Sequence, residues 1–430
     1  MARESILHPW RIEFHAPLLV AGGLPKAVRK AARAGPATHD NRLCLLYAEG
    51  MGMKPLISVI VPVYNGQDFL FNCIESIQAQ TYPNLEVVII NDGSTDQTAA
   101  VCENIVCKYG NIRLISLEGK GVSSARNAGM AAAKGVYIAF VDADDRLLPK
   151  TLELLYKTLL ETDADIAGCG FECWYTERQW DQTVAREAGE EAEKDIKEDA
   201  YRIYSGKTFV CEEILKGNSR CWSKLYKRDL IGNICFRQGL TIGEDMLFLV
   251  DLMPGVKKVV EIPYKGYGYY QNPAGAMNGA FRPQYMDQIT CWEMAREIID
   301  GMWKTPLKGE ARDKEALIKK TLNGETADKE TQIKEALGEE MSAGQVRAQV
   351  TAILIMGIML TAGKLAMLSQ KERRLQAAHV EKCHAILKRE LQVPGAYERL
   401  SAGYRVKVKI FGAFPGVYLC LYHFKDKLRA

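Results

Sequence analysis

The sequence predicts an α/β fold with a doubly wound, mainly parallel sheet, flanking helices and a helical carboxyl-terminal region. Between residues 56 and 171, short β-rich runs alternate with segments of helical spacing. Such alternation implies parallel strand pairing through helical crossovers. Beyond residue 286 the apolar residues recur at helical spacing. A ligand site is expected beyond the carboxyl ends of the strands, as in other doubly wound sheets.

Five β-rich runs predict strands, at 56–61, 85–90, 112–117, 136–141 and 165–171. Helices are expected between them, at 69–80, 122–134 and 147–160, with another after the turn at 91–96. In the first helix Leu70, Cys73, Ile74 and Ile77 share one face, which predicts packing on the sheet. The later apolar run 353–360 is shorter than the about 20 residues of a bilayer span, so we expect a buried helix.

The overall composition excludes several classes of protein. The 430 residues are 47% hydrophobic and 25% charged, as in ordinary globular chains. A net charge of +3 is too small to favour nucleic acid as a partner. The 12 cysteines form no Cys-x-x-Cys pair, which disfavours a zinc knuckle and suits reduced thiols in the cytoplasm. All six histidines precede residue 40 or follow residue 378, which disfavours a Ser-His-Asp or Cys-His hydrolase in the main domain.

An acidic cluster, Asp142-Ala143-Asp144-Asp145, follows the fourth predicted strand. If the backbone stays extended there, Asp142 and Asp144 share one face. Two such carboxylates could hold a divalent cation that bridges diphosphate oxygens. The alternative is an acidic turn that caps the following helix, and the cluster by itself does not decide between the two.

The turns after the first two strands contain Tyr64 and Asp92. An aromatic ring and a carboxylate suit a nucleobase, by stacking and by accepting an N–H hydrogen bond. The alternative is ordinary turn chemistry, in which Asn, Asp and Gly occur for local reasons. Neither Gly-x-Gly-x-x-Gly nor a P-loop follows the first strand, which disfavours a dinucleotide dehydrogenase and a P-loop enzyme.

A second acid pair, Glu244-Asp245, precedes an apolar stretch. Because histidine is missing from this region, Asp245 is a candidate general base for an acceptor hydroxyl. Glu244 could raise the pKa of Asp245 through like-charge repulsion. The alternative is an acid pair at a helix N-terminus, where the helix dipole favours negative charge.

In combination, these segments closely resemble family 2 glycosyltransferases of the GT-A fold. The resemblance is unbroken from about residue 55 to 160, and it resumes in three later segments. The matching segments are 59–66 (VIVPVYNG), 74–82 (IESIQAQTY), 90–96 (INDGSTD), 121–129 (GVSSARNAG), 137–145 (YIAFVDADD), 222–228 (WSKLYKR), 243–248 (GEDMLF) and 269–273 (YYQNP). Residues 160–215 and 303–347 depart from the family pattern.

On the donor side, the resemblance implies a nucleoside pocket. Pro62, Tyr64 and Asp92 would line this pocket, and Asp142 would contact the nucleoside. Arg126 would lie near the base or the phosphates. The donor implied is a nucleoside-diphosphate sugar, with a UDP-sugar as the expectation.

On the acceptor side, the resemblance implies an inverting transfer to a hydroxyl of a glycan or a lipid-linked acceptor. Asp245 would be the catalytic base, with Glu244 as its neighbour, and Asp144 would ligate Mn²⁺ or Mg²⁺. Trp222 and Lys224 would shape the sugar and acceptor side. An α-linked donor would then give a β-linked product, as in polysaccharide biosynthesis at the cell envelope.

The resemblance and the composition divide the chain into four parts. Residues 1–52 have no clear period and fit neither a signal peptide nor a membrane span. We expect a disordered extension there, with the native start at Met51 or Met53. The other parts are a glycosyltransferase domain at 53–285 (nucleotide-sugar half 55–160, acceptor half 205–285), a helical region at 286–400 with a charged insertion at 303–347, and a basic amphipathic segment at 401–430.

In the segment 405–429, basic residues flank an aromatic, apolar stretch. This composition suits peripheral contact with an anionic membrane surface. The alternative is a helix packed on the enzyme with its lysines outside. Pro415 and Gly416 interrupt the stretch, which argues against a spanning helix. We expect a cytoplasmic protein, and membrane contact would place it at the inner face of the cell membrane.

Two other functions stay open. A nucleotidyltransferase that makes nucleotide-sugars also needs a nucleotide pocket and a metal carboxylate. It would need a basic, Gly-rich loop after the first strand, and the sequence has Pro62-Val63-Tyr64-Asn65 instead. A non-catalytic sugar-nucleotide-binding scaffold is disfavoured by the presence of Asp144 and Asp245.

Overall fold

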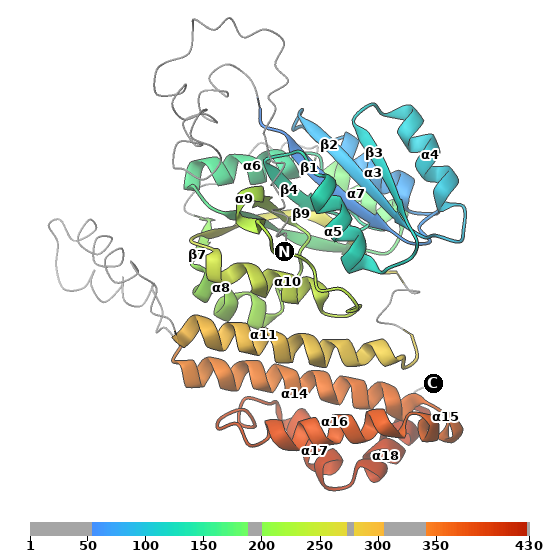
Figure 1. Ribbon diagram of the computed structural model, residues 1–430, viewed down its shortest axis with the longest axis vertical. Coiled ribbons are helices and arrows are strands. Elements are labelled where there is room, and N and C mark those ends of the chain that lie inside the picture. The colour runs from blue at the N-terminus through green and yellow to red at the C-terminus, as the bar shows by residue number, and fades with distance from the viewer. Residues whose placement is uncertain (1–53, 188–199, 273–278, 305–340, 428–430) are drawn as a thin grey trace, which may run out of the picture. The chain divides into compact units, whose positions relative to one another are not determined.

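The computed structural model describes residues 54–187, 200–272, 279–304 and 341–427. The extension expected at 1–52 lies outside the described residues, as does most of the charged insertion expected at 303–347. From Leu56 onward the chain forms one unit. Its described strands make a nine-stranded sheet covered by helices on both faces, and further helices stack beyond α10 (Figure 1).

The first half of the sheet is parallel, which confirms the prediction. The four strands lie in the order β3 (Ile112–Leu117), β2 (Leu85–Asp92), β1 (Ile57–Val63) and β4 (Tyr137–Phe140). Every residue of β1 is buried, because helices cover both faces, and this accounts for its continuous apolar run. The strands point the same way, so the residues that follow β1, β2 and β4 gather at one edge of the sheet.

The second half of the sheet mixes directions. β8 (Lys224–Lys227) pairs antiparallel with both β4 and β6 (Ile166–Trp174), so β6 runs in the direction of β4 without pairing with it. β9 (Val259–Tyr270) is parallel to β6, and the short strands β5 (Arg146–Leu147) and β7 (Arg202–Tyr204) are antiparallel to β9. The sequence predicts β6 correctly, but it does not predict that β8 separates β6 from β4.

Alternating residues of β1 pack into two different hydrophobic cores, one on each face of the sheet, as expected for a doubly wound sheet. Val59 and Val61 face one core and Ile60 faces the other. The helices on the first face are α3 (Leu70–Gln78), α4 (Thr98–Lys108) and α6 (Thr151–Thr162), and those on the second are α5 (Val122–Ala132), α8 (Gly206–Glu212) and α10 (Glu244–Leu252). The smaller elements are α7 (Glu177–Glu187), α9 (Arg228–Ile231), η3 (Ile214–Lys216), η4 (Met253–Gly255) and η5 (Pro283–Met286).

The helices after residue 286 form a third core around Ile355, Leu387 and Phe411. Cys291 and Ile299 on the first of these helices also join the core beneath α10, so this helix packs against the sheet-bearing part of the chain. The described helices of this region are α11 (Asp287–Lys304), α14 (Ala343–Met367), α15 (Gln370–Leu375), α16 (Ala377–Glu390), α17 (Ala402–Ala413) and α18 (Pro415–Lys427).

Among the described residues, α14 is the one helix long and apolar enough to cross a membrane. It has 25 residues, so it is longer than its apolar run predicts. However, 72% of its most apolar window is buried inside the protein. The prediction of a buried helix is therefore confirmed, although a short helix was expected.

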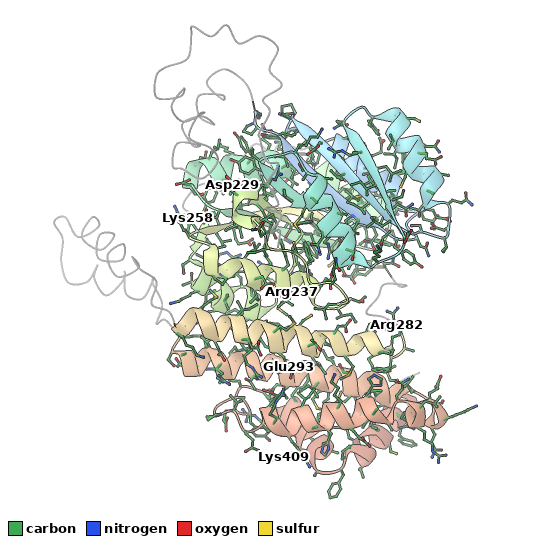
Figure 2. All side chains as sticks on the ribbon, in the orientation of Figure 1. Asp229, Arg237, Lys258, Arg282, Glu293 and Lys409 are labelled. Carbon is green, nitrogen blue, oxygen red and sulfur yellow. The ribbon has the colours of Figure 1, made fainter. Side chains whose placement is uncertain are left out.

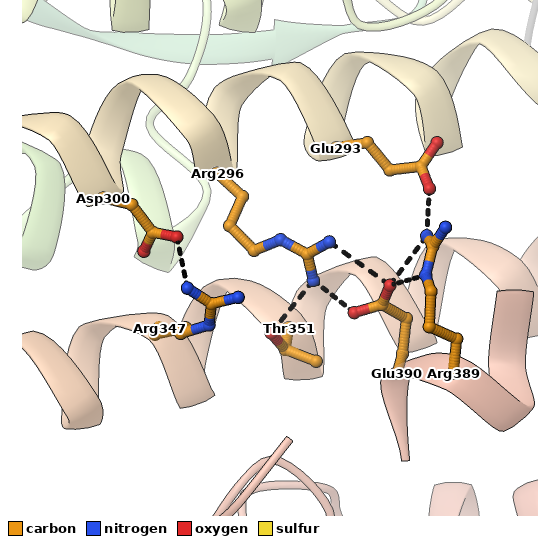
Figure 3. Close-up of polar contacts among 7 residues, drawn as sticks. All are labelled: Glu293, Arg296, Asp300, Arg347, Thr351, Arg389 and Glu390. Atoms are coloured by element: carbon orange, nitrogen blue, oxygen red, sulfur yellow. Dashed lines mark hydrogen bonds and ion pairs between the residues drawn. The ribbon is translucent and has the colours of Figure 1, made fainter. Parts of the chain in front are cut away.

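Ion pairs join α11 to α14 and α16 (Figure 3). The side chain of Glu390 is buried, with 1% of its surface exposed. It accepts hydrogen bonds from Arg296 Nη2 at 3.2 Å and from Arg389 Nε at 2.8 Å. Nearby, Arg347 Nη1 donates to Asp300 at 2.7 Å, with half of the Arg347 side chain exposed. The first group is buried and the second faces solvent, so their contributions to stability should differ.

We expect Glu390→Gln to lower the free energy of unfolding by about 3–5 kcal/mol, because it leaves Arg296 without its anionic partner. Asp300→Asn is the matched control, since an exposed pair contributes about 1 kcal/mol or less. Urea denaturation followed by circular dichroism measures both variants. Equal shifts of the two unfolding midpoints would contradict the structural role of Glu390.

Candidate active site

The acidic cluster forms a turn after β4. This strand ends at Phe140, and the Asp145 N–H donates to the Asp142 carbonyl oxygen at 3.0 Å. The backbone does not stay extended here, so the condition under which Asp142 and Asp144 would share one strand face is not met. Asp142 and Asp144 still interact, because burial and then the charge of Asp142 raise the pKa of Asp144 to about 6. The two carboxylates share one electrostatic environment.

Asp145 anchors this turn to β9. The Tyr267 hydroxyl donates to one Asp145 carboxylate oxygen at 2.6 Å, and the Tyr270 N–H donates to the other at 2.8 Å. Burial raises the pKa of Asp145 well above its ordinary range. No side chain caps the start of α6 at Thr151, so the alternative of a helix-capping acid is wrong. The sequence did not predict this anchor, because its partners lie 122 and 125 residues away.

The turns after β1 and β2 interlock. The Asn65 side-chain oxygen accepts from the Thr95 N–H at 2.8 Å, and the Asn65 N–H donates to the Ser94 hydroxyl at 3.0 Å. Pro62 is buried within β1, whereas Tyr64 is 61% exposed. The Tyr64 ring is therefore open to a ligand, and its stacking on a nucleobase stays a prediction.

Asp92 ends β2 and holds the loop that leads into α5. Its carboxylate oxygens accept from the Lys120 N–H at 2.9 Å and from the Gly121 N–H at 2.7 Å. Gly121 has a φ of 90°, a backbone conformation that favours glycine. Each carboxylate oxygen keeps a further lone pair, so a nucleobase contact by Asp92 is compatible with these bonds.

Arg126 on α5 joins the two acidic sites. Its Nη2 donates to Asp142 at 3.0 Å, and its Nη1 donates to Glu244 at 2.9 Å. The residue is 4% exposed, and its Nε has no hydrogen-bond partner among the described residues. The sequence places Arg126 near a base or phosphates, but it does not predict this bridge between carboxylates 102 positions apart in the chain.

The second acid pair occupies the first turn of α10. Gly243 precedes the helix, and Glu244 and Asp245 begin it, where the dipole favours negative charge. Burial, and then the charge of Asp245, raises the pKa of Glu244 to about 7. Burial also raises the pKa of Asp245, while Arg126 lowers it. Burial is therefore the largest cause of the raised pKa of Asp245, and the like-charge repulsion within the pair acts as the second cause of the raised pKa of Glu244.

Trp222 and Lys224 have different surroundings, although both were expected on the sugar side. The Trp222 ring stacks on Tyr267 and Tyr269, with centroids 4.3 Å and 5.3 Å apart. Lys224 Nζ lies 3.9 Å from Glu261, and its side chain has no exposed surface. Lys224 is therefore held in a buried ion pair, and its expected role in shaping the sugar and acceptor side stays a prediction.

The surroundings of Asp144 fit a divalent cation that is completed by a substrate. Among the residues that the structure describes, no three His, Cys, Asp or Glu side chains gather into a metal cage. Asp142 is ion-paired through one oxygen, Asp145 is bonded to β9 through both, and Asp144 makes a hydrogen bond with the neutral Asn272, so Asp144 is the carboxylate of the three without a cationic or β9 partner. Mg²⁺ commonly binds through one or two carboxylates together with substrate phosphates and water. A single available carboxylate suits that arrangement.

The sheet and its carboxyl-edge turns have the arrangement of the GT-A fold, and the acid pair on α10 lies at the same site. Residues 58–230 match the model of Glycosyl transferase family 2. This match supports a family 2 glycosyltransferase domain over these residues.

Relatives and solved structures agree with the family. The chain is 30% identical to the uncharacterized glycosyltransferase EpsJ of Bacillus subtilis (strain 168), over 54% of this chain and 65% of EpsJ. It is 34% identical to the uncharacterized glycosyltransferase YibD of Escherichia coli (strain K12), over 50% of this chain and 61% of YibD. The chain thus spans less than two thirds of the length of these relatives.

The fold is similar to that of TarS 1-349 of S. aureus, solved in complex with UDP-GlcNAc. The TM-score is 0.55, with 18% sequence identity, and the match covers 86% of this chain and 91% of that one. At this identity the similarity shows the shared fold alone.

Proposed function

We propose that the protein transfers a sugar from a nucleoside-diphosphate donor to a hydroxyl group of a glycan or lipid-linked acceptor, with inversion. The observation that carries this proposal is the Asp142–Arg126–Glu244 bridge, which holds the turn after β4 and the first turn of α10 in one cluster. A donor site and a base for the acceptor are thereby brought together. The proposal assigns the donor to residues 55–160 and the acceptor to residues 205–285.

Asp245 is the base in this proposal. It accepts the proton of the acceptor hydroxyl while the acceptor oxygen bonds to the anomeric carbon and the bond to the diphosphate breaks. The raised pKa of Asp245 makes it a better proton acceptor than an exposed aspartate. A single displacement of this kind inverts the anomeric centre, so an α-linked donor gives a β-linked product.

The donor in this proposal is a UDP-sugar. The similarity to TarS, which binds UDP-GlcNAc, supports this choice. Pro62, Tyr64 and Asp92 would contact the nucleoside, together with Asp142. Mn²⁺ or Mg²⁺ on Asp144 would neutralise charge on the departing diphosphate.

Nucleotide release from a panel of UDP- and GDP-sugars, with Mn²⁺, Mg²⁺ or EDTA, tests the proposal. We expect release from one nucleotide-sugar and its loss in EDTA. Release of pyrophosphate from a nucleoside triphosphate and a sugar 1-phosphate would point to a nucleotidyltransferase instead. Tight binding of a nucleotide-sugar without any release would point to a scaffold.

We also propose that α17 and α18 contact the inner face of an anionic membrane, which would make this a cytoplasmic, peripheral protein. Large apolar side chains on these helices and at the residue between them, Phe414, are half or more exposed; they are Val406, Phe414, Val417, Leu421 and Phe424. Basic residues accompany them, including Lys409 (Figure 2). Apolar side chains flanked by cations suit the boundary between lipid head groups and acyl chains.

We expect the double variant Phe414→Ser/Phe424→Ser to float with anionic vesicles about tenfold less than the wild type, since two exposed phenyl rings lose their burial in lipid. Phe71→Ser on α3 is the control, because it removes an exposed ring elsewhere. Flotation with phosphatidylglycerol and phosphatidylcholine vesicles measures the bound fraction. A wild type that floats with neither vesicle would overturn the membrane proposal.

A further inference from the structure

One arginine close to β8 lies against a group of aromatic rings. Arg220 precedes β8, and its guanidinium carbon is 4.4 Å from the Phe171 ring centroid and 5.1 Å from that of Trp222. Trp222 stacks in turn on Tyr269, with centroids 5.3 Å apart. We call Phe171, Trp222 and Tyr269 the aromatic shelf. Arg220 lies over this shelf as a cation on an apolar base.

The shelf is open to a ligand. Phe171, Arg220 and Tyr269 are each half-buried, whereas Trp222 beneath them is buried. Aromatic side chains with a few polar groups are typical linings of ligand sites. A sugar ring on the shelf would therefore meet a guanidinium beside it.

The charge of Arg220 is not bonded to any carboxylate that the structure describes, and the side chain makes no hydrogen bond there. This distinguishes it from Arg126, which pairs with two carboxylates. Burial lowers the pKa of Arg220, and the charge of Asp245 opposes that shift. Arginine keeps its charge in such surroundings. Its five N–H donors are thus available, in a fork that matches a carboxylate or a phosphate.

We propose that Arg220 binds an anionic group of the acceptor, a carboxylate or a phosphate close to the hydroxyl that Asp245 deprotonates. The inference rests on the proposed function and narrows its acceptor to a charged glycan or polyol. Cys221, the next residue in the chain, is buried in the core that α10 joins through Met246. The charge of Asp245 on α10 also acts on Arg220. Proximity to α10 favours an acceptor anion over the diphosphate of the donor, which is expected at Asp144.

Three probes with one sugar scaffold test the proposal: glucose, glucuronate and glucose 6-phosphate. Their dissociation constants are measured by ligand-observed NMR, with the protein saturated in UDP. The variants are Arg220→Gln, Arg220→Lys and the control Arg178→Gln, which removes an exposed arginine on α7. The affinity of each variant for UDP alone is measured separately.

We expect the wild type to bind at least one charged probe about tenfold or more tighter than glucose, the range for hydrogen bonds to a charged group. Arg220→Gln should abolish this preference, Arg220→Lys should keep part of it because the fork is lost but the charge stays, and Arg178→Gln should keep all of it. Tighter binding of glucuronate would indicate a carboxylate on the acceptor, and tighter binding of glucose 6-phosphate would indicate a phosphate.

Two results of the probe measurements would overturn the inference: no preference for a charged probe in the wild type, or an unchanged preference in Arg220→Gln. Weaker UDP binding in Arg220→Gln would overturn it as well, since Arg220 would then serve the donor diphosphate. The proposed function is tested by a different measurement, nucleotide release, so the failure of the proposed function and the failure of this inference can be told apart.

Discussion

Asp245→Asn is expected to lower kcat by about 10²–10⁴-fold and to leave the fold intact. The amide has nearly the size of the carboxylate, but it cannot accept the proton of an acceptor hydroxyl. Asp245 lies at the start of α10, where Arg126 and Arg220 act on its charge. Its loss should therefore affect the chemical step far more than donor binding.

The pH dependence of kcat/KM is an independent test of Asp245 as the catalytic base. A base must be deprotonated, so activity is present above the pKa of Asp245 and is lost as the pH falls through it. Burial raises this pKa, so the acid limb should lie above the range of an exposed aspartate. Asp251→Asn, at the other end of α10 and paired with Arg237, is the control and should keep activity. If the turnover of Asp245→Asn stayed within threefold of the wild type, Asp245 would not be the catalytic base.

Much of the fold could be predicted because its first half depends on local patterns. β1 and β2 are buried runs of apolar, mostly β-branched residues, and period and composition identify them. β5 has two residues and β7 has three, and both exist only through pairing with β9. Pairings between distant short segments leave no periodic signal in the sequence.

In the candidate site, too, some features follow from local sequence patterns and others do not. Asp92, Asp144 and Asp245 stand in recognisable segments, so the sequence alone proposes them. The Arg126 bridge to Glu244 spans 118 residues, and no local pattern encodes it. The surroundings of Lys224 were also not predictable. It stands in a matching segment, but its side chain is fully buried beside Glu261, 37 residues further along the chain.

Asp144→Ala is expected to reduce turnover by at least about 10²-fold, because it removes the carboxylate left for a metal. The neighbouring acids cannot replace it. Asp142 is held by Arg126 at 3.0 Å, and Asp145 is held by the Tyr267 hydroxyl at 2.6 Å. Burial raises the pKa of Asp144 to about 6, so removing this buried acid should not weaken the fold.

Titration of activity with Mn²⁺ and Mg²⁺ separates a metal ligand from a structural residue. If Asp144 is a metal ligand, Asp144→Ala should need far more metal for activity or show no activity, and its unfolding midpoint should be unchanged. Asp145→Asn should behave differently, because that residue anchors the turn to β9 and its loss should lower stability. Asp181→Ala, an exposed acid on α7, is the control for loss of one negative charge. If Asp144→Ala kept the metal dependence of the wild type, Asp144 would not be a metal ligand, and other groups would have to hold the metal.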